Sequence, residues 1–168
     1  EVKNFNPLDH FDRKEARKYD RYCQFGLVAA EEAINDSGID YEGVDKDHIG
    51  VIWASGIGGL RTFHDEVAGY AKGDGTPRYN PFFIPKMIAD IAAGHISINH
   101  GFRGPNFATV SACASSANAL SDAFNYIRLG TAIAFVAGGS EAAITEEGVG
   151  GFNAMHAIST RNDDPATA

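Results

Sequence analysis

Residues 107–116, Phe107-Ala108-Thr109-Val110-Ser111-Ala112-Cys113-Ala114-Ser115-Ser116, lead from a predicted strand directly into a predicted helix. The apolar run over residues 107–112 is typical of a buried strand. The helix is predicted from Cys113 to about Leu129, where Gly130 ends it. Its apolar residues recur at helical spacing and are Ala117, Leu120, Phe124 and Ile127. A strand that continues at once into a helix is the unit from which α/β folds are built.

The rest of the chain repeats this alternation. Short apolar runs over residues 49–54 and 132–137 predict two more strands. Apolar residues at helical spacing predict helices over residues 12–37, from Leu60 onward and over residues 84–98. Because the strands are continuously apolar, we expect a mostly parallel sheet that helices cover on both faces, which is an α/β fold.

The composition is that of an ordinary globular protein, with 44% hydrophobic and 21% charged residues in a chain of 168. Its 14 basic and 22 acidic residues leave a net charge of -8, which argues against a nucleic acid or an anionic membrane as the main partner. The apolar run over residues 132–137 is much too short to cross a bilayer. Cys23 and Cys113 form neither a CxxC pair nor a metal-ligand spacing, so we expect reduced thiols and a cytoplasmic location.

Familiar cofactor motifs are incomplete or missing. Residues 56–61, Gly-Ile-Gly-Gly-Leu-Arg, match a dinucleotide fingerprint at three positions, but Arg61 replaces the last glycine. The sequence has no phosphate-binding GxxxxGK[ST] loop and no HExxH or Cys/His cluster, so we expect no cofactor and no metal. His95 lies on an apolar helical stripe, which indicates a hydrogen-bonded core histidine.

Cys113 is the candidate nucleophile. It is predicted at the N-terminus of a helix, where free backbone N–H groups and the helix dipole favour a thiolate and can hold a developing oxyanion. This turn also falls at the carboxyl end of a strand, the usual ligand site of an open parallel sheet. The alternative is a buried, inert cysteine. Cys23, on the apolar face of a helix, is predicted to be such a core residue.

At this point several motifs carry a family resemblance. Val110–Ser115, with residues 101–105 (Gly-Phe-Arg-Gly-Pro) before it and residues 136–141 (Val-Ala-Gly-Gly-Ser-Glu) after it, resembles the β-ketoacyl-acyl-carrier-protein synthases, in particular the elongating type II enzymes of bacterial fatty acid synthesis. The resemblance covers essentially the whole chain. Further matches in the same order are residues 55–60, 80–85, 93–95, 148–152 and 158–162.

The resemblance implies a thiolase-like fold and an acyl transfer through Cys113. In the family the cysteine takes an acyl group from acyl-carrier-protein, malonyl-carrier-protein loses carbon dioxide, and the carbanion attacks the thioester to give a longer 3-oxoacyl product. By position, Ile57 resembles the gate of the acyl pocket, and Phe83 and Phe152 resemble the aromatic lining of its far end. The alternative for these three residues is simple packing.

A basic run near the N-terminus is the candidate partner surface. Lys14, Arg17 and Lys18 match family positions that receive acidic acyl-carrier-protein, and a positive face on a net-negative protein would steer that partner. Such a run is otherwise a solvated helix face. The resemblance also implies a homodimer.

The resemblance further implies that residues 1–168 are a partial N-terminal thiolase-like domain. The family's two decarboxylation histidines and its second oxyanion donor belong to its C-terminal half, and its first strand precedes Glu1. We therefore expect the chain alone to be inactive and to expose apolar surface and a sheet edge. Two alternatives stay open: a non-catalytic module that binds acyl chains or carrier protein, and a thiolase-fold acyltransferase that uses coenzyme A.

Overall fold

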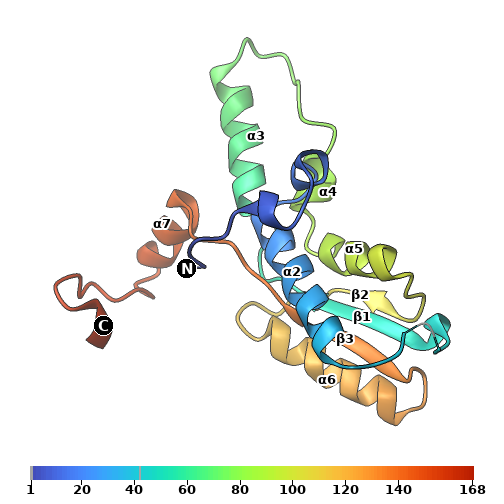
Figure 1. Cartoon of the computed structure of the whole chain (residues 1–168). Coiled ribbons are helices and arrows are strands. Elements are labelled where there is room, and N and C mark those ends of the chain that lie inside the picture. The colour runs from blue at the N-terminus through green and yellow to red at the C-terminus, as the bar shows by residue number, and fades with distance from the viewer. Residues whose placement is uncertain (1, 42) are drawn as a thin grey trace.

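The computed structural model describes residues 2–41 and 43–168 and contains a parallel sheet between layers of helices (Figure 1). The strands, within the described residues, are β1 (Ile49–Ala54), β2 (Asn106–Phe107) and β3 (Ala134–Gly139), in the order β2-β1-β3. The α-helices are α1 (Arg13–Ala16), α2 (Arg21–Asp36), α3 (Leu60–Lys72), α4 (Phe83–Met87), α5 (Ile91–His100), α6 (Ser115–Arg128) and α7 (Glu146–Ala154). Short 3-10 turns are η1 (Pro7–Asp9), η2 (Lys46–His48) and η3 (Pro165–Thr167).

The central strand β1 is buried on both faces, as its continuous apolar sequence predicts. Val51 and Trp53 pack with residues of α2 and α5, whereas Ile52 and Ala54 pack with residues of α6 on the opposite face. Figure 1 shows the same three layers, with α3 and α7 extending away from the sheet. The prediction of a parallel α/β sheet with helices on both faces is confirmed.

The single helix predicted over residues 12–37 is wrong, because the chain breaks before Asp20 and forms α1 and α2. Asp20 adopts an extended backbone, and its Oδ1 accepts a hydrogen bond from the Tyr22 N–H at 3.2 Å, which caps α2. Its Oδ2 accepts bonds from the N–H and the hydroxyl of Thr62, at 3.1 Å and 2.5 Å. This buried carboxylate therefore starts α2 and ties it to α3.

The helix predicted over residues 84–98 is also split, into α4 and α5. Ile88 between them has an extended backbone, and its carbonyl accepts a hydrogen bond of 2.5 Å from the Tyr22 hydroxyl. This bond from Tyr22 on α2 thus stabilises the extended backbone at Ile88, although the apolar residues continue at helical spacing across the break.

The strand predicted over residues 107–112 is wrong beyond Phe107. Only Asn106 and Phe107 pair with β1; the segment that follows forms its polar contacts locally, with Ser115 at the start of α6.

Strand β3 lies two residues later than predicted, because Gly138 and Gly139 pair with Trp53 and Ala54 instead of ending the strand.

Helix α6 presents a different face to the sheet from the one its sequence indicates. Ala119 and Ala123 pack against β1, while the predicted apolar stripe is solvent-exposed, with exposed fractions of 56% for Leu120 and 60% for Phe124. The expectation of exposed apolar surface is thus confirmed on this helix.

Among the described residues, no helix combines the length and the apolar character that crossing a membrane requires.

Candidate active site

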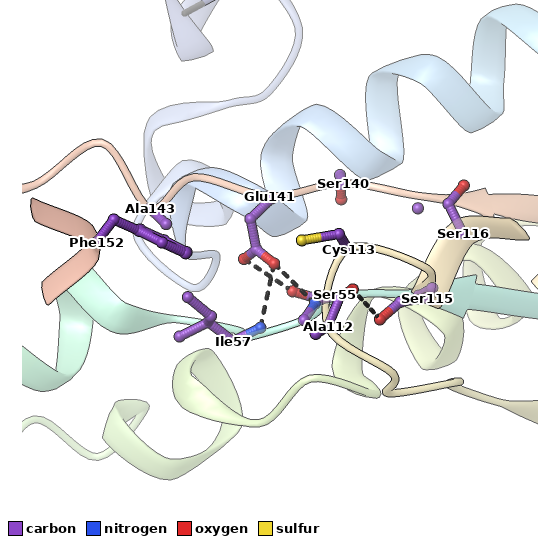
Figure 2. Close-up of a pocket in the computed structure, with 13 residues that line it drawn as sticks. Ser55, Ile57, Ala112, Cys113, Ser115, Ser116, Ser140, Glu141, Ala143 and Phe152 are labelled. Carbon is purple, nitrogen blue, oxygen red and sulfur yellow. Dashed lines mark hydrogen bonds between the residues drawn. The ribbon is translucent and has the colours of Figure 1, made fainter. Parts of the chain in front are cut away.

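A cavity of about 340 Å³ lies at the carboxyl ends of β1 and β3, beside the N-terminal end of α6. The loops that follow these two strands, the turn before α6 and one side chain of α7 form its walls. Its lining residues are Ala54, Ser55, Gly56, Ile57, Ala112, Cys113, Ser115, Ser116, Gly139, Ser140, Glu141, Ala143 and Phe152 (Figure 2).

The sequence predicted Cys113 as the first residue of a helix. It lies instead in the loop just before α6, which begins at Ser115. Its side chain is exposed and points into the cavity (Figure 2). Ala112, which precedes it, has a φ of 51°, a left-handed conformation that costs an alanine about 1–2 kcal/mol. No side chain among the described residues caps α6; the N–H groups of Ala114 and Ser115 donate instead to the carbonyls of Ser111 and Ala112, at 3.1 Å and 3.2 Å. The Cys113 turn thus lies directly at the amino end of the helix, where the helix dipole favours negative charge.

Ser115 holds the Cys113 turn in its strained shape. This residue is 4% exposed, and its hydroxyl donates to the Ala112 carbonyl at 2.6 Å and accepts from the Ser111 N–H at 2.8 Å. The Ser115 carbonyl in turn accepts a bond of 2.8 Å from the Thr109 hydroxyl. Sequence reasoning missed Ser115 as a positioning residue, and its only signal was a hydroxyl beside the cysteine.

Cys23 contrasts with Cys113. It lies on α2 and is fully buried in the hydrophobic core, so the prediction of a core residue is confirmed. Burial raises the pKa of the Cys23 thiol to about 12, and the nearby Asp20 carboxylate adds to that rise. Cys23 therefore stays a thiol at neutral pH and is not a nucleophile.

Ile57 and Phe152 both line the cavity, although they come from the β1–α3 loop and from α7. Figure 2 shows the Phe152 ring and the Cys113 sulfur directed into the same space from opposite ends. Phe83 does not line this cavity; on α4 it stacks on Tyr79 with ring centroids 5.4 Å apart. The acyl-pocket role of all three residues stays a prediction.

Glu141 is the functional-site residue that sequence reasoning left without a role. It follows β3, and its carboxylate accepts hydrogen bonds from the Ser55 hydroxyl at 3.1 Å and from the N–H groups of Gly56 and Ile57 at 2.7 Å and 3.1 Å. A carboxylate just after a buried parallel strand is itself a sequence signal, because strand ends converge on the ligand site.

The basic residues Lys14, Arg17 and Lys18 lie on and just after the short helix α1. Lys14 and Arg17 are exposed, whereas Lys18 is half-buried and close enough to His95 to add to the lowering of the pKa of that imidazole, which burial mainly causes. His95 is half-buried rather than fully in the core and packs edge-on against Tyr19. The exposed Lys14 and Arg17 share the α1 surface with the exposed carboxylates of Asp12 and Glu15.

Within residues 2–41 and 43–168, no group of three or more His, Cys, Asp or Glu side chains is arranged to hold a metal ion.

The fold is thiolase-like, and solved ketosynthases share it. A β-ketoacyl synthase from Burkholderia phymatum STM815 superposes with a TM-score of 0.84 at 26% sequence identity, over 98% of this chain and 40% of that one. A type II PKS ketosynthase in complex with its acyl-carrier protein superposes with a TM-score of 0.83 over 90% of this chain and 43% of that one; at 21% identity this likeness concerns the fold alone.

Sequence comparison gives the family. The model of the family described as "Beta-ketoacyl synthase, N-terminal domain" matches residues 1–168, so the chain belongs to the β-ketoacyl synthase family. It is 48% identical to 3-oxoacyl-[acyl-carrier-protein] synthase 2 of Staphylococcus aureus strain N315 and 45% identical to the protein of the same name from Synechocystis sp.. The whole chain aligns in both cases, yet it spans 40% of the length of each relative.

Proposed function

We propose that this chain is the nucleophile-bearing part of a 3-oxoacyl-[acyl-carrier-protein] synthase of fatty acid elongation, in which Cys113 carries the growing acyl group. The observation that carries the proposal is the exposed Cys113 side chain, held by a strained turn at the amino end of α6 and directed into a cavity that Ile57 and Phe152 also line. The 48% identity to an enzyme of that name over the whole chain supports it.

The first half-reaction is acyl transfer to sulfur. The Cys113 thiol loses its proton, and the thiolate attacks the thioester carbonyl of an acyl-carrier-protein. A new carbon–sulfur bond forms, the bond between the acyl carbon and the carrier sulfur breaks, and the carrier thiolate leaves and takes up a proton in place of the one that Cys113 lost. The backbone N–H of Cys113 stabilises the oxyanion formed in this attack, and the resemblance places the second donor in the family's C-terminal half. The acyl chain then extends along the apolar wall of the cavity towards Ile57 and Phe152.

The second half-reaction makes the carbon–carbon bond. Malonyl-carrier-protein loses carbon dioxide, and the electron pair of the broken bond forms a new bond to the acyl carbon on Cys113. The Cys113 sulfur leaves as thiolate, which regenerates the site. The decarboxylating groups belong to the family's C-terminal half, so residues 1–168 supply only the acyl-carrying half of the chemistry.

The surface formed by Lys14, Arg17 and Lys18 is the proposed docking site for acyl-carrier-protein. Its positive charge contrasts with the net charge of -8 of the chain, and an acidic carrier would be attracted to it. The relative that is 48% identical over the whole chain is named 3-oxoacyl-[acyl-carrier-protein] synthase 2, which supports a partner of this kind. We also propose that the complete enzyme is a homodimer.

Mass spectrometry of the full-length protein that contains this chain tests the proposal. Incubation with acyl-acyl-carrier-protein should add one acyl mass to a peptide with Cys113 and none to a peptide with Cys23. Addition of malonyl-carrier-protein should discharge the adduct as a 3-oxoacyl product. Cys113→Ala should abolish both steps, while Cys23→Ala should retain them.

Two outcomes would contradict the proposal. Carrier-protein binding without any adduct on Cys113 would indicate a non-catalytic binding module. An adduct formed equally well from acyl-coenzyme A, with turnover indifferent to charge reversal at Lys14, Arg17 and Lys18, would indicate a coenzyme A-dependent acyltransferase.

A further inference from the structure

The segment that carries Ile57 is held from two sides. On one side the Glu141 carboxylate accepts the N–H groups of Gly56 and Ile57 and the hydroxyl of Ser55. Both backbone bonds are charge-assisted, and such bonds are about twice as strong as neutral ones. Because the Ser55 hydroxyl also accepts the Gly58 N–H at 2.9 Å, this carboxylate organises the whole segment from Ser55 to Gly58.

On the other side the segment lies against the backbone of α4. The Gly59 N–H donates to the Met87 carbonyl at 2.9 Å, and a Cβ on Gly59 would lie 2.3 Å from the Lys86 carbonyl oxygen. Gly58 has a φ of 76°, which a residue with a side chain rarely adopts. The segment is thus pressed between α4 and Glu141, with little room to shift unless one side gives way.

Glu141 is itself firmly placed by its neighbour Ser140. The Ser140 N–H extends the ladder between β3 and β1 with a bond of 3.0 Å to the Ala54 carbonyl. The Ser140 hydroxyl donates to the Tyr22 carbonyl at 2.7 Å and accepts from the Trp53 indole at 3.0 Å. A rigid strand end therefore presents the Glu141 carboxylate to the Ile57 segment.

From this geometry we propose that Glu141 is a positioning residue that sets how far the Ile57 side chain reaches into the cavity, and thereby which acyl lengths the site accepts. The inference rests on the proposed function, since it concerns an acyl chain on Cys113. Glu141 acts through its three hydrogen bonds and takes part in no bond-making step. Ile57, which is 45% exposed and lines the cavity, is the side chain that would meet the acyl chain.

The test uses the full-length protein and a series of acyl-carrier-proteins that differ by two carbons. Glu141→Gln keeps the size of the side chain but turns one acceptor oxygen into a donor, and Glu141→Ala removes all three bonds. In both variants the ratio of kcat/KM for the preferred length over that for the next longer one should fall, by about tenfold for Glu141→Ala, the scale of discrimination that one or two methylenes provide. Glu32→Gln, an exposed glutamate on α2, is the matched control and should keep the wild-type ratio.

A double-mutant cycle separates positioning from a general structural role. With Ile57→Ala already present, Glu141→Gln should leave the length profile unchanged, because the side chain through which the carboxylate acts is gone. In Glu141→Gln with Ile57 intact, the KM values for long and short acyl substrates should converge. The amount of acyl adduct on Cys113 across the length series, measured by mass spectrometry, gives the same comparison without turnover.

The inference is overturned if Glu141→Gln keeps the wild-type length profile, or if it alters the profile equally with and without Ile57. It is also overturned if Glu141→Gln does not fold, since the carboxylate is then only structural. In these cases wild-type condensation is intact and the proposed function stands. A wild-type protein that forms no adduct on Cys113 overturns the proposed function and this inference together.

Discussion

Replacement of Ser115 by alanine tests whether the Cys113 turn is held in place by a single buried hydroxyl. The hydroxyl donates to the Ala112 carbonyl and accepts the Ser111 N–H. At about 1 kcal/mol for each bond, Ser115→Ala should cost about 2 kcal/mol of unfolding free energy, a factor of about 30 in the folded-to-unfolded ratio. This is comparable with the 1–2 kcal/mol that the left-handed Ala112 costs, so the variant removes the interactions that offset the strain.

Two measurements on the full-length protein check this prediction. Urea unfolding should show the loss of stability, and the rate of Cys113 acylation should fall, because a relaxed Ala112 moves the sulfur away from the amino end of α6. Ser121→Ala, an exposed serine on the same helix, is the control and should be neutral or slightly stabilising. If Ser115→Ala matches Ser121→Ala in both stability and acylation rate, the hydroxyl does not hold the turn.

The remaining predictions concern thiol access, α7 and the basic surface. At pH 8, iodoacetamide should label Cys113 and leave Cys23 unlabelled, since burial raises the pKa of Cys23 to about 12; labelling of Cys23 in the folded protein would contradict its core position. Gly148→Ala should lower the free energy of unfolding by about 1–3 kcal/mol and displace Phe152 from the cavity, because the new Cβ would lie 1.9 Å from the Ala143 carbonyl oxygen. Gly150→Ala, with open space around it, is the control and should be neutral or stabilising in thermal melts. Charge reversal of Lys14 and Arg17 together should raise KM for acyl-carrier-protein at low salt with little change in kcat, and an unchanged KM would remove α1 as the docking surface.

The sequence predicted those features that depend on local pattern. Strand β1 matches its prediction residue for residue, and α3 begins at Leu60 as expected. Cys113 was predicted at a strand-to-helix turn, and it lies in that turn beside the cavity. These features follow from apolar runs, glycines and helix periodicity, which neighbouring residues determine.

Features that depend on distant partners were missed. The break before Asp20 depends on Thr62, and the break at Ile88 depends on the Tyr22 hydroxyl. Sequence analysis did not predict helix α7, although Thr145 caps it by accepting the Gly148 N–H. The face of α6 that meets the sheet was misassigned, because the close approach to β1 selects small alanines rather than the larger apolar residues.

The role of Glu141 escaped sequence reasoning for the same reason. Its carboxylate binds residues 84 to 86 positions earlier in the chain, and no local pattern reports such a pairing.

That separation in sequence also bears on the order in which the site is assembled during synthesis. Closing a loop of this length costs about 4 kcal/mol of chain entropy, which the β1–β3 ladder has to offset before the carboxylate can reach its partners. Because chains leave the ribosome amino end first, β1 and the Ile57 segment emerge long before Glu141 does. The cavity beside Cys113 is therefore a late product of folding, and a nascent chain that stalls before β3 would present an exposed sheet edge but no finished cavity.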